Sequence, residues 1–199
     1  MSGTPLRGVL ACTAFVAGCA LAQDGAAPSA IPARVALVNP GFESLAPGMF
    51  GNPEGWFSIQ HAGELSYTFK LDTAQPHGGA RSARVDNVGP EPFGAIYQQI
   101  DASPRRGRRV RFSAWLRTEE ARGSFTGGGA VLMLQAMQNG APLAWNHMKE
   151  SPVSGTTGWT RHAIELDVPE AADRLELGAM LHGPGRLWLD DAELLVLPR

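Results

Sequence analysis

Cysteine is scarce in this chain of 199 residues. The two cysteines, Cys12 and Cys19, both lie in the first 22 residues, in a segment that has the character of a leader. Removal of that leader leaves no cysteine pair, so disulfide bonds are excluded as a source of stability even in an oxidising compartment. The remaining chain has the size of one domain and can bury a hydrophobic core without them.

Long hydrophobic runs are missing as well. The longest uncharged apolar run, residues 8–21, follows Arg7 and is shorter than the roughly 20 apolar residues that span a bilayer. This pattern predicts a signal peptide over residues 1–22 and an exported protein, periplasmic or secreted. Two cleavage routes stay open, because residues 20–22 form a small-x-small site whereas residues 16–19 resemble a bacterial lipobox. The second route would make Cys19 a lipid anchor, as in an outer-membrane lipoprotein. Residues 23–32 are predicted to form a flexible tether.

Charge of one sign is not in excess. The formal net charge is −2 and charged residues make up 18% of the chain, so a nucleic-acid partner is not expected. Five arginines cluster in residues 105–111. This cluster is interpreted as a solvated turn that enters a strand, with contact to polyanions as the alternative.

Catalytic motifs are absent. The five histidines show no metal-ligand spacing such as His-Glu-x-x-His, and neither a Gly-x-Ser-x-Gly turn nor a phosphate-binding glycine loop occurs. The sequence therefore predicts a protein that is not an enzyme and has no catalytic residues. The catalytic alternative is a jelly-roll polysaccharide lyase that would use Gln60, His61 and Tyr97 with an arginine.

Short segments of alternating apolar and polar residues dominate the rest of the chain. They are separated by turn residues, and glycine and proline number 24 and 15. This pattern predicts an all-β domain over residues 33–199, a jelly-roll β-sandwich of two antiparallel sheets. The predicted strands span residues 34–37, 56–60, 65–71, 83–87, 95–100, 109–118, 130–138, 160–168, 174–181 and 186–197.

Two of these segments indicate which side chains face the core. In residues 109–118 the even-numbered positions are apolar, whereas the odd-numbered positions place Trp115 among arginines that include Arg117. An indole on that second face is unusual if the face meets only solvent. Residues 130–138 are largely apolar on both faces, which predicts a central strand that is covered on both sides.

Four groups of motifs follow one another along the chain. They are Asn-Pro-Gly-Phe-Glu at 39–43 with Gly-Trp at 55–56, His-Gly-Gly-Ala-Arg-Ser at 77–82, Tyr-Gln-Gln-Ile at 97–100 and Leu-Trp-Leu-Asp-Asp at 187–191. In this order they resemble the motifs of galactose-binding-like jelly rolls, in particular the xylan- and glucan-binding carbohydrate-binding modules, although Gly78 stands where serine is usual in that family. The resemblance implies their fold and a polysaccharide or oligosaccharide ligand.

The resemblance also implies a structural calcium ion. It assigns Glu43 and Asp190 as carboxylate ligands, with backbone carbonyls from the first loop and from the turn at 77–79 completing the site. The chemistry agrees, because calcium prefers several oxygen ligands and two acids from opposite ends of the chain would hold those ends together. The alternative is that Asp190 and Asp191 only flank the last strand.

Aromatic side chains provide the candidate sugar site, since pyranose rings stack on aromatic faces while polar groups bond their hydroxyls. Trp56, Trp159 and Trp188 are interpreted as structural. A covering loop is the alternative to a ligand role for Trp115. The predicted ligand-binding residues are Trp115, Tyr97, Trp145, Gln135 and Arg117.

The predicted function is therefore non-catalytic polysaccharide binding. The alternative from another class is a structural or protein-interaction domain of the bacterial envelope with the same fold and no sugar ligand. The sequence specifies no oligomeric state.

Overall fold

The computed structural model describes residues 1, 3, 31–47, 52–123 and 129–198. The predicted signal peptide, with Cys19, lies almost wholly outside these residues. Within them no helix is long and apolar enough to cross a membrane. The elements are β1 (Ala33–Val35), β2 (Phe57–Gln60), β3 (Tyr67–Asp72), β4 (Ser82–Asn87), β5 (Phe93–Asp101), a 3-10 turn η1 (Ser103–Arg105), β6 (Arg109–Ala121), β7 (Ala130–Gln138), β8 (Ala141–Asn146), β9 (Gly155–Asp167), β10 (Arg174–His182) and β11 (Arg186–Val196).

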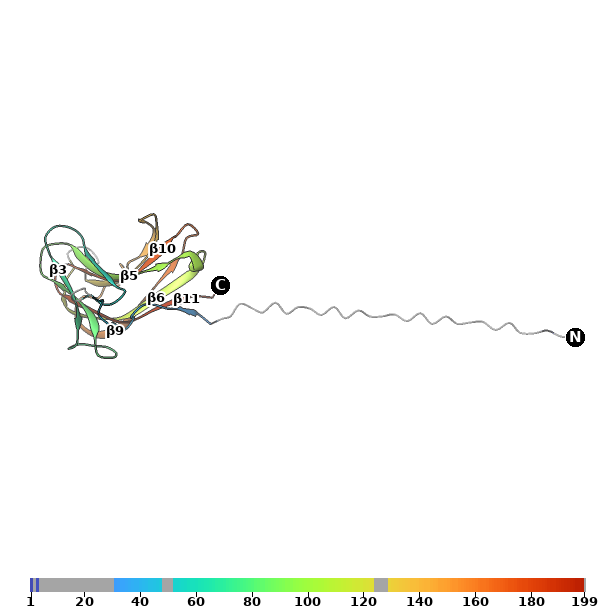
Figure 1. Cartoon of the computed structure of the whole chain (residues 1–199), viewed down its shortest axis with the longest axis horizontal. Helices are drawn as coiled ribbons and strands as arrows, with labels where there is room; N and C mark the ends of the chain where they lie inside the picture. Colours follow the sequence, from blue (N-terminus) through green and yellow to red (C-terminus); the bar gives the residue numbers. More distant parts are fainter. Residues whose placement is uncertain (2, 4–30, 48–51, 124–128, 199) are drawn as a thin grey trace.

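The strands form two antiparallel sheets that pack face to face (Figure 1). One sheet has the order β3-β4-β11-β6-β9, and β1 also pairs with β11, so it is called the six-stranded sheet. The five-stranded sheet has the order β2-β5-β10-β7-β8. The predicted jelly-roll β-sandwich is thereby confirmed.

Alternation places the core between the sheets as predicted. Val110, Phe112, Ala114 and Leu116 of β6 are all fully buried. Strand β7 lies between β10 and β8, and Val131 and Met133 on its outward side are also buried. The apolar runs of the sequence therefore identified the inner face of β6 and the double coverage of β7.

Strand β8 was not among the predicted strands, although the signal for it is in the sequence. Asn139 and Gly140 join β7 to β8 with φ values of 50° and 81°. An Asn-Gly pair with both φ values positive is the preferred two-residue turn of a β-hairpin. Pro142 lies within β8 and cannot donate a ladder hydrogen bond, so its presence in the sequence argues against a strand. It is tolerated here because β8 is an edge strand with an irregularity near it.

The basic cluster at 105–111 is held by acceptors of the protein itself. Arg105, Arg106 and Arg108 donate to main-chain carbonyl oxygens of Asp101, Ala172 and Leu197. Arg109 and Arg111 pair with carboxylates of β9. These contacts support the interpretation of the cluster as a turn that leads into β6.

Candidate functional site

The outward face of the five-stranded sheet carries a row of polar and aromatic side chains. The strand register places Gln99 of β5 opposite Glu176 of β10, Glu176 opposite Gln135 of β7, and Gln135 opposite Trp145 of β8. Residues directly opposite in adjacent strands point to the same side of the sheet. These four residues, with Phe57, Tyr97 and Arg174, are called the binding face below.

Glu176 is the centre of a hydrogen-bond network on this face. Its carboxylate accepts hydrogen bonds from Gln99 Nε2 at 3.0 Å, Arg174 Nε at 3.2 Å and Gln135 Nε2 at 3.4 Å. Only 9% of Glu176 is exposed. The network holds a carboxylate, two amides and a guanidinium together on the outward side of the sheet, where their donors and acceptors could contact a ligand with several hydroxyls.

Aromatic rings flank this network at both edges of the sheet. Phe57 lies opposite Tyr97, with 5.8 Å between ring centroids, and is 52% exposed. Trp145 on edge strand β8 is 53% exposed. Since neighbouring strands are about 4.8 Å apart, Tyr97 and Trp145 lie roughly 15 Å from each other across the face.

Tyr97 keeps its hydroxyl proton at neutral pH. Burial, and next the negative charge of Glu176, raise the pKa of Tyr97 above its ordinary value. The phenol can therefore both donate and accept a hydrogen bond. Beside it Gly178 carries no side chain, and a Cβ there would collide with the carbonyl oxygen of Ile96. No side chain of β10 therefore projects from the sheet between Tyr97 and β7.

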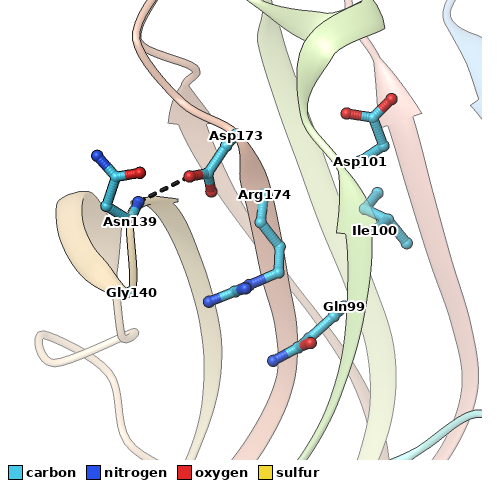
Figure 2. Close-up of a pocket in the computed structure, with 7 residues that line it drawn as sticks. All are labelled: Gln99, Ile100, Asp101, Asn139, Gly140, Asp173 and Arg174. Carbon is cyan, nitrogen blue, oxygen red and sulfur yellow. Dashed lines mark hydrogen bonds between the residues drawn. The ribbon is translucent and has the colours of Figure 1, made fainter.

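A hollow of about 560 Å³ continues the binding face at one end of the strands (Figure 2). Gln99 and Arg174 extend into it from β5 and β10, opposite the hairpin at Asn139 and Gly140. The main-chain N–H of Asn139 donates to Asp173 Oδ2 at 2.7 Å, which fastens that hairpin to β10. The polar network thus opens toward solvent on this side.

The five predicted ligand-binding residues are divided between two faces. Tyr97, Gln135 and Trp145 lie on the binding face, whereas Trp115 and Arg117 lie on β6, on the outward side of the six-stranded sheet. Alternation correctly indicated which side chains of a predicted strand face away from the core. Which sheet a strand joins depends on non-local pairing, which alternation does not report.

Trp115 is covered on one ring face by the turn at 77–81. The His77 imidazole stacks on it with 3.9 Å between centroids, and Trp159 meets His77 edge-on at 5.6 Å. Arg117 lies over the ring of Trp188 at 5.5 Å. Trp56 and Trp188 are buried and donate their indole N–H groups to protein acceptors, as expected for structural tryptophans.

Sequence reasoning missed Phe57, Gln99, Arg174 and Glu176. The signal for Glu176 is a lone acid in strand Arg174–His182, whose inward positions are all apolar (Leu175, Leu177, Ala179 and Leu181). Phe57 could have been found because it follows Trp56 and therefore points to the opposite side of β2.

The predicted calcium ligands both contact the turn at 77–81. Asp190 Oδ2 accepts hydrogen bonds from the N–H groups of His77 and Gly78, and Glu43 Oε1 accepts from those of Ala80 and Arg81. This arrangement of Glu43, Asp190 and the turn is called the terminal clip. The loop that carries Glu43 is also bonded to β11, since the main-chain N–H of Ala192 donates to Pro40 O.

The clip contains a buried carboxylate without a cationic partner. Asp190 is fully buried, it forms no ion pair with a described residue, and burial raises its pKa to about 6 although three main-chain N–H groups bond it. Asn39, Phe42 and Asp191 nearby have φ values of 47°, 56° and 48°. Such left-handed conformations persist only where surrounding contacts enforce them.

A metal ion at the clip would depend on main-chain oxygens. In the described part of the chain no group of three or more His, Cys, Asp or Glu side chains could hold one. Calcium accepts main-chain carbonyls among its six to eight oxygen ligands, so Glu43 and Asp190 fit it as two carboxylates of a mixed set.

Comparison with solved structures finds the same fold in proteins of different function. No family model matches the chain. A xylan-binding domain of family 22 from Paenibacillus barcinonensis superposes with a TM-score of 0.51 at 12% identity, over 80% of this chain and 92% of that one. A cyclase from Fischerella sp. TAU superposes with a TM-score of 0.55 at 12% identity, over 84% and 99%. These likenesses show that the chain has a β-sandwich fold that occurs both in a carbohydrate-binding module and in a cyclase.

One curated protein also resembles the chain in sequence. It is an uncharacterized HTH-type transcriptional regulator, YbfP, of Bacillus subtilis (strain 168), 28% identical over 142 residues. The match covers 69% of this chain and 46% of that protein. The chain thus spans less than half the length of the regulator.

Proposed function

We propose that the binding face holds a polysaccharide and does not cleave it. The observation that carries this proposal is the arrangement of aromatic rings on either side of the Glu176 network, with exposed Phe57 beside half-buried Tyr97 on one side and exposed Trp145 on the other. The xylan-binding domain with the same fold supports it as an analogy of architecture.

The chemistry of a sugar matches this arrangement. A pyranose ring has an apolar face that stacks on Trp145 or on Tyr97, and its hydroxyls both donate and accept hydrogen bonds. Glu176 accepts from hydroxyls, Arg174 donates, and the amides of Gln99 and Gln135 do either. Because the network is already formed, the ligand would bind to side chains that need little reordering.

Binding without catalysis is favoured over the lyase alternative by distance. The main-chain N–H of His61 donates to Phe93 O, whereas Tyr97 lies four residues further along β5. Four residues of a strand span about 13 Å, so His61 and Tyr97 do not act on one bond. His61 is instead paired with Glu91 at 2.8 Å.

The proposal includes a calcium ion at the terminal clip. Glu43 and Asp190 would hold it, and the ion would supply the positive charge that buried Asp190 lacks. Its role would be structural. We also propose that the chain is exported, either free after cleavage near residue 22 or anchored through Cys19.

Affinity electrophoresis of the full chain in gels with single soluble polysaccharides tests the binding function. With calcium present, we expect retardation in at least one gel, and loss of that retardation in Trp145→Ala. Trp115→Ala serves as a matched variant on the other sheet and should remain retarded. Loss in Trp115→Ala alone would place the site on the six-stranded sheet. No retardation in any gel would favour the envelope protein-interaction alternative.

A further inference from the structure

A second hollow lies beside strand β8, beyond the edge of the binding face. It has a volume of about 830 Å³ and is bounded by β8, by the loop at 147–151 and by β9 from Ala163 to Asp167. Strand β8 is the edge of the five-stranded sheet and β9 is the edge of the six-stranded sheet. The hollow is therefore a groove between two free strand edges, and it is called the edge groove below.

The floor of the edge groove is ordered and partly apolar. Asn146 Nδ2 of β8 donates to Glu165 O of β9 at 3.1 Å, which ties the two edges together. Ile164 and Met148 line the same space and are almost fully buried. An apolar floor with polar walls is the composition of a ligand groove rather than of a gap filled only by water.

Trp145 belongs to both the binding face and the edge groove. Its position opposite Gln135 aims the indole to the outward side of the five-stranded sheet, and the same residue lines the groove. Since 53% of Trp145 is exposed, the ring stands at the corner where the two surfaces meet. A chain-like ligand that crosses the face toward β8 reaches the groove directly after this ring.

The charges of the edge groove favour a neutral, hydroxyl-rich ligand. Glu150, Glu165 and Asp167 line it together with a single lysine, Lys149. Burial, and next the charge of Lys149, lower the pKa of His147, so that this neighbour is neutral at pH 7. Glu165 and Asp167 are paired with Arg111 and Arg109 of β6, so the charges around the groove nearly balance and give a uronate or a sulfate no net attraction. The carboxylates still accept hydrogen bonds from hydroxyls.

We infer that the edge groove is a second subsite, joined to the binding face at Trp145, which takes further neutral sugar units of the same polysaccharide. The inference rests on the proposed function and extends it from one sheet face to a path that turns around β8. It predicts that a short oligosaccharide fills the face alone, whereas a longer one also fills the groove.

Calorimetric titration with neutral β-1,4-linked trisaccharides and hexasaccharides of xylose, glucose and galactose tests this inference. In the unmodified protein the hexasaccharide of the preferred sugar should bind at least tenfold more tightly than the trisaccharide. Ser151→Trp places an indole in the groove, away from the binding face. In this variant the hexasaccharide should bind no better than the trisaccharide, and binding of the trisaccharide should not change.

Two matched proteins control for the added indole. Thr73→Trp introduces the same side chain at an exposed turn that lines none of the described hollows, and it should keep the tenfold preference for length. Glu150→Trp, a second groove-filling variant, should repeat the result of Ser151→Trp, and unchanged melting temperatures would show that both variants are folded.

The outcomes separate the groove from the face. If the trisaccharide binds but Ser151→Trp and Glu150→Trp keep the length preference, the groove inference is wrong while the proposed function stands. If neither length of any sugar binds, both fail together. Tighter binding of oligogalacturonate than of every neutral oligosaccharide would overturn the assignment to neutral sugars.

Discussion

Glu176 shows how one buried acid organises a surface. Its carboxylate accepts from Gln99, Gln135 and Arg174, and each of those side chains is thereby held in place. In Glu176→Gln an NH2 group replaces one carboxylate oxygen, so a hydrogen-bond donor faces the donors of Gln99, Gln135 and Arg174. We expect a loss of about 1 kcal/mol in the free energy of unfolding and roughly tenfold weaker glycan binding.

Urea denaturation and affinity electrophoresis measure the two effects of that substitution. Glu64→Gln is the matched control, because it makes the same chemical change at an exposed loop residue. If both variants behave like the unmodified protein, Glu176 is only a surface acid and the network does not shape the face.

His162 makes stability depend on pH. It lies on β9 opposite Ala114, its buried Nε2 has no hydrogen-bond partner among the described residues, and burial lowers its pKa below the ordinary value of 6.5. The unfolded chain then binds the proton more readily than the folded one, so the contribution of His162 to stability is complete above pH 6.5 and decreases as the pH falls below it.

The pH effect is measured as a difference between two proteins. Unfolding free energies at pH 7.5 and 5.5 should decrease less in His162→Gln than in the unmodified protein. The comparison removes the opposite contribution of Asp190, whose pKa is raised, because that residue is present in both proteins. Equal decreases in the two proteins would mean that His162 is solvated in the folded state.

At the residue level, alternation and residue type were sufficient for part of the binding face. Trp145 was proposed because an exposed indole in a polar segment needs a reason, and Tyr97 and Gln135 were proposed with it. The structure places all three on the binding face, and their role in ligand binding is still a prediction. Glu176 was missed because its role depends on Gln99 and Gln135, which come from two other strands. A cross-strand network is not encoded in any local pattern.

The hairpin of β7 and β8 is the element on which the edge of the site depends. It positions Trp145, and its two-residue turn requires positive φ at Asn139 and Gly140. A Cβ at Gly140 would meet no atom within 4 Å, so the cost of Gly140→Ala is purely conformational. We expect about 1 kcal/mol of destabilisation, together with weaker glycan binding.

Gly158 on β9 offers the matched control for this backbone effect. An added methyl group at Gly158 would also meet open space, but the φ of this residue is not in the left-handed region. Gly158→Ala should therefore cause no loss of thermal stability, whereas Gly140→Ala should lower the melting temperature by about 2–4 °C. A similar decrease in both would contradict the requirement for the tight turn.

Ten of the strands could be predicted because their periodicity is local, and their ends were placed within a few residues. Strand β8 was not, since Pro142 stands near its start and its residues, Ala-Pro-Leu-Ala-Trp-Asn, do not alternate between apolar and polar. This omission affected the prediction of the site, because Trp145 was treated as part of a polar segment and not as a residue on the edge strand of a sheet. An Asn-Gly pair directly after an apolar strand was the stronger signal.

At the scale of the whole molecule, the two sheets give the protein two unlike faces. Strand β10 pairs with β5 and β7, and β11 pairs with β4 and β6, all distant in sequence. Trp115 and Trp145 therefore point away from opposite sides of the sandwich. Trp115 stacks on His77 of the terminal clip, whereas Trp145 is exposed beside the Glu176 network.

The terminal clip joins parts of the chain that are far apart in sequence. Glu43 and Asp190 lie near opposite ends of the domain and both bond the turn at 77–81. A calcium ion held there would bind the folded chain only, because the unfolded chain does not bring the two acids together. At a concentration one hundredfold above its dissociation constant it would add about 2.7 kcal/mol to the free energy of unfolding.

Thermal unfolding with and without a chelator measures this contribution. For a domain of this size, about 2.7 kcal/mol corresponds to a melting temperature higher by roughly 5–10 °C with calcium. Glu43→Gln removes one carboxylate at the edge of the clip and should abolish the response to calcium, whereas Glu64→Gln should keep it. A melting temperature that chelator leaves unchanged would mean that main-chain N–H groups alone satisfy Asp190, and that the fold closes its two ends without a metal ion.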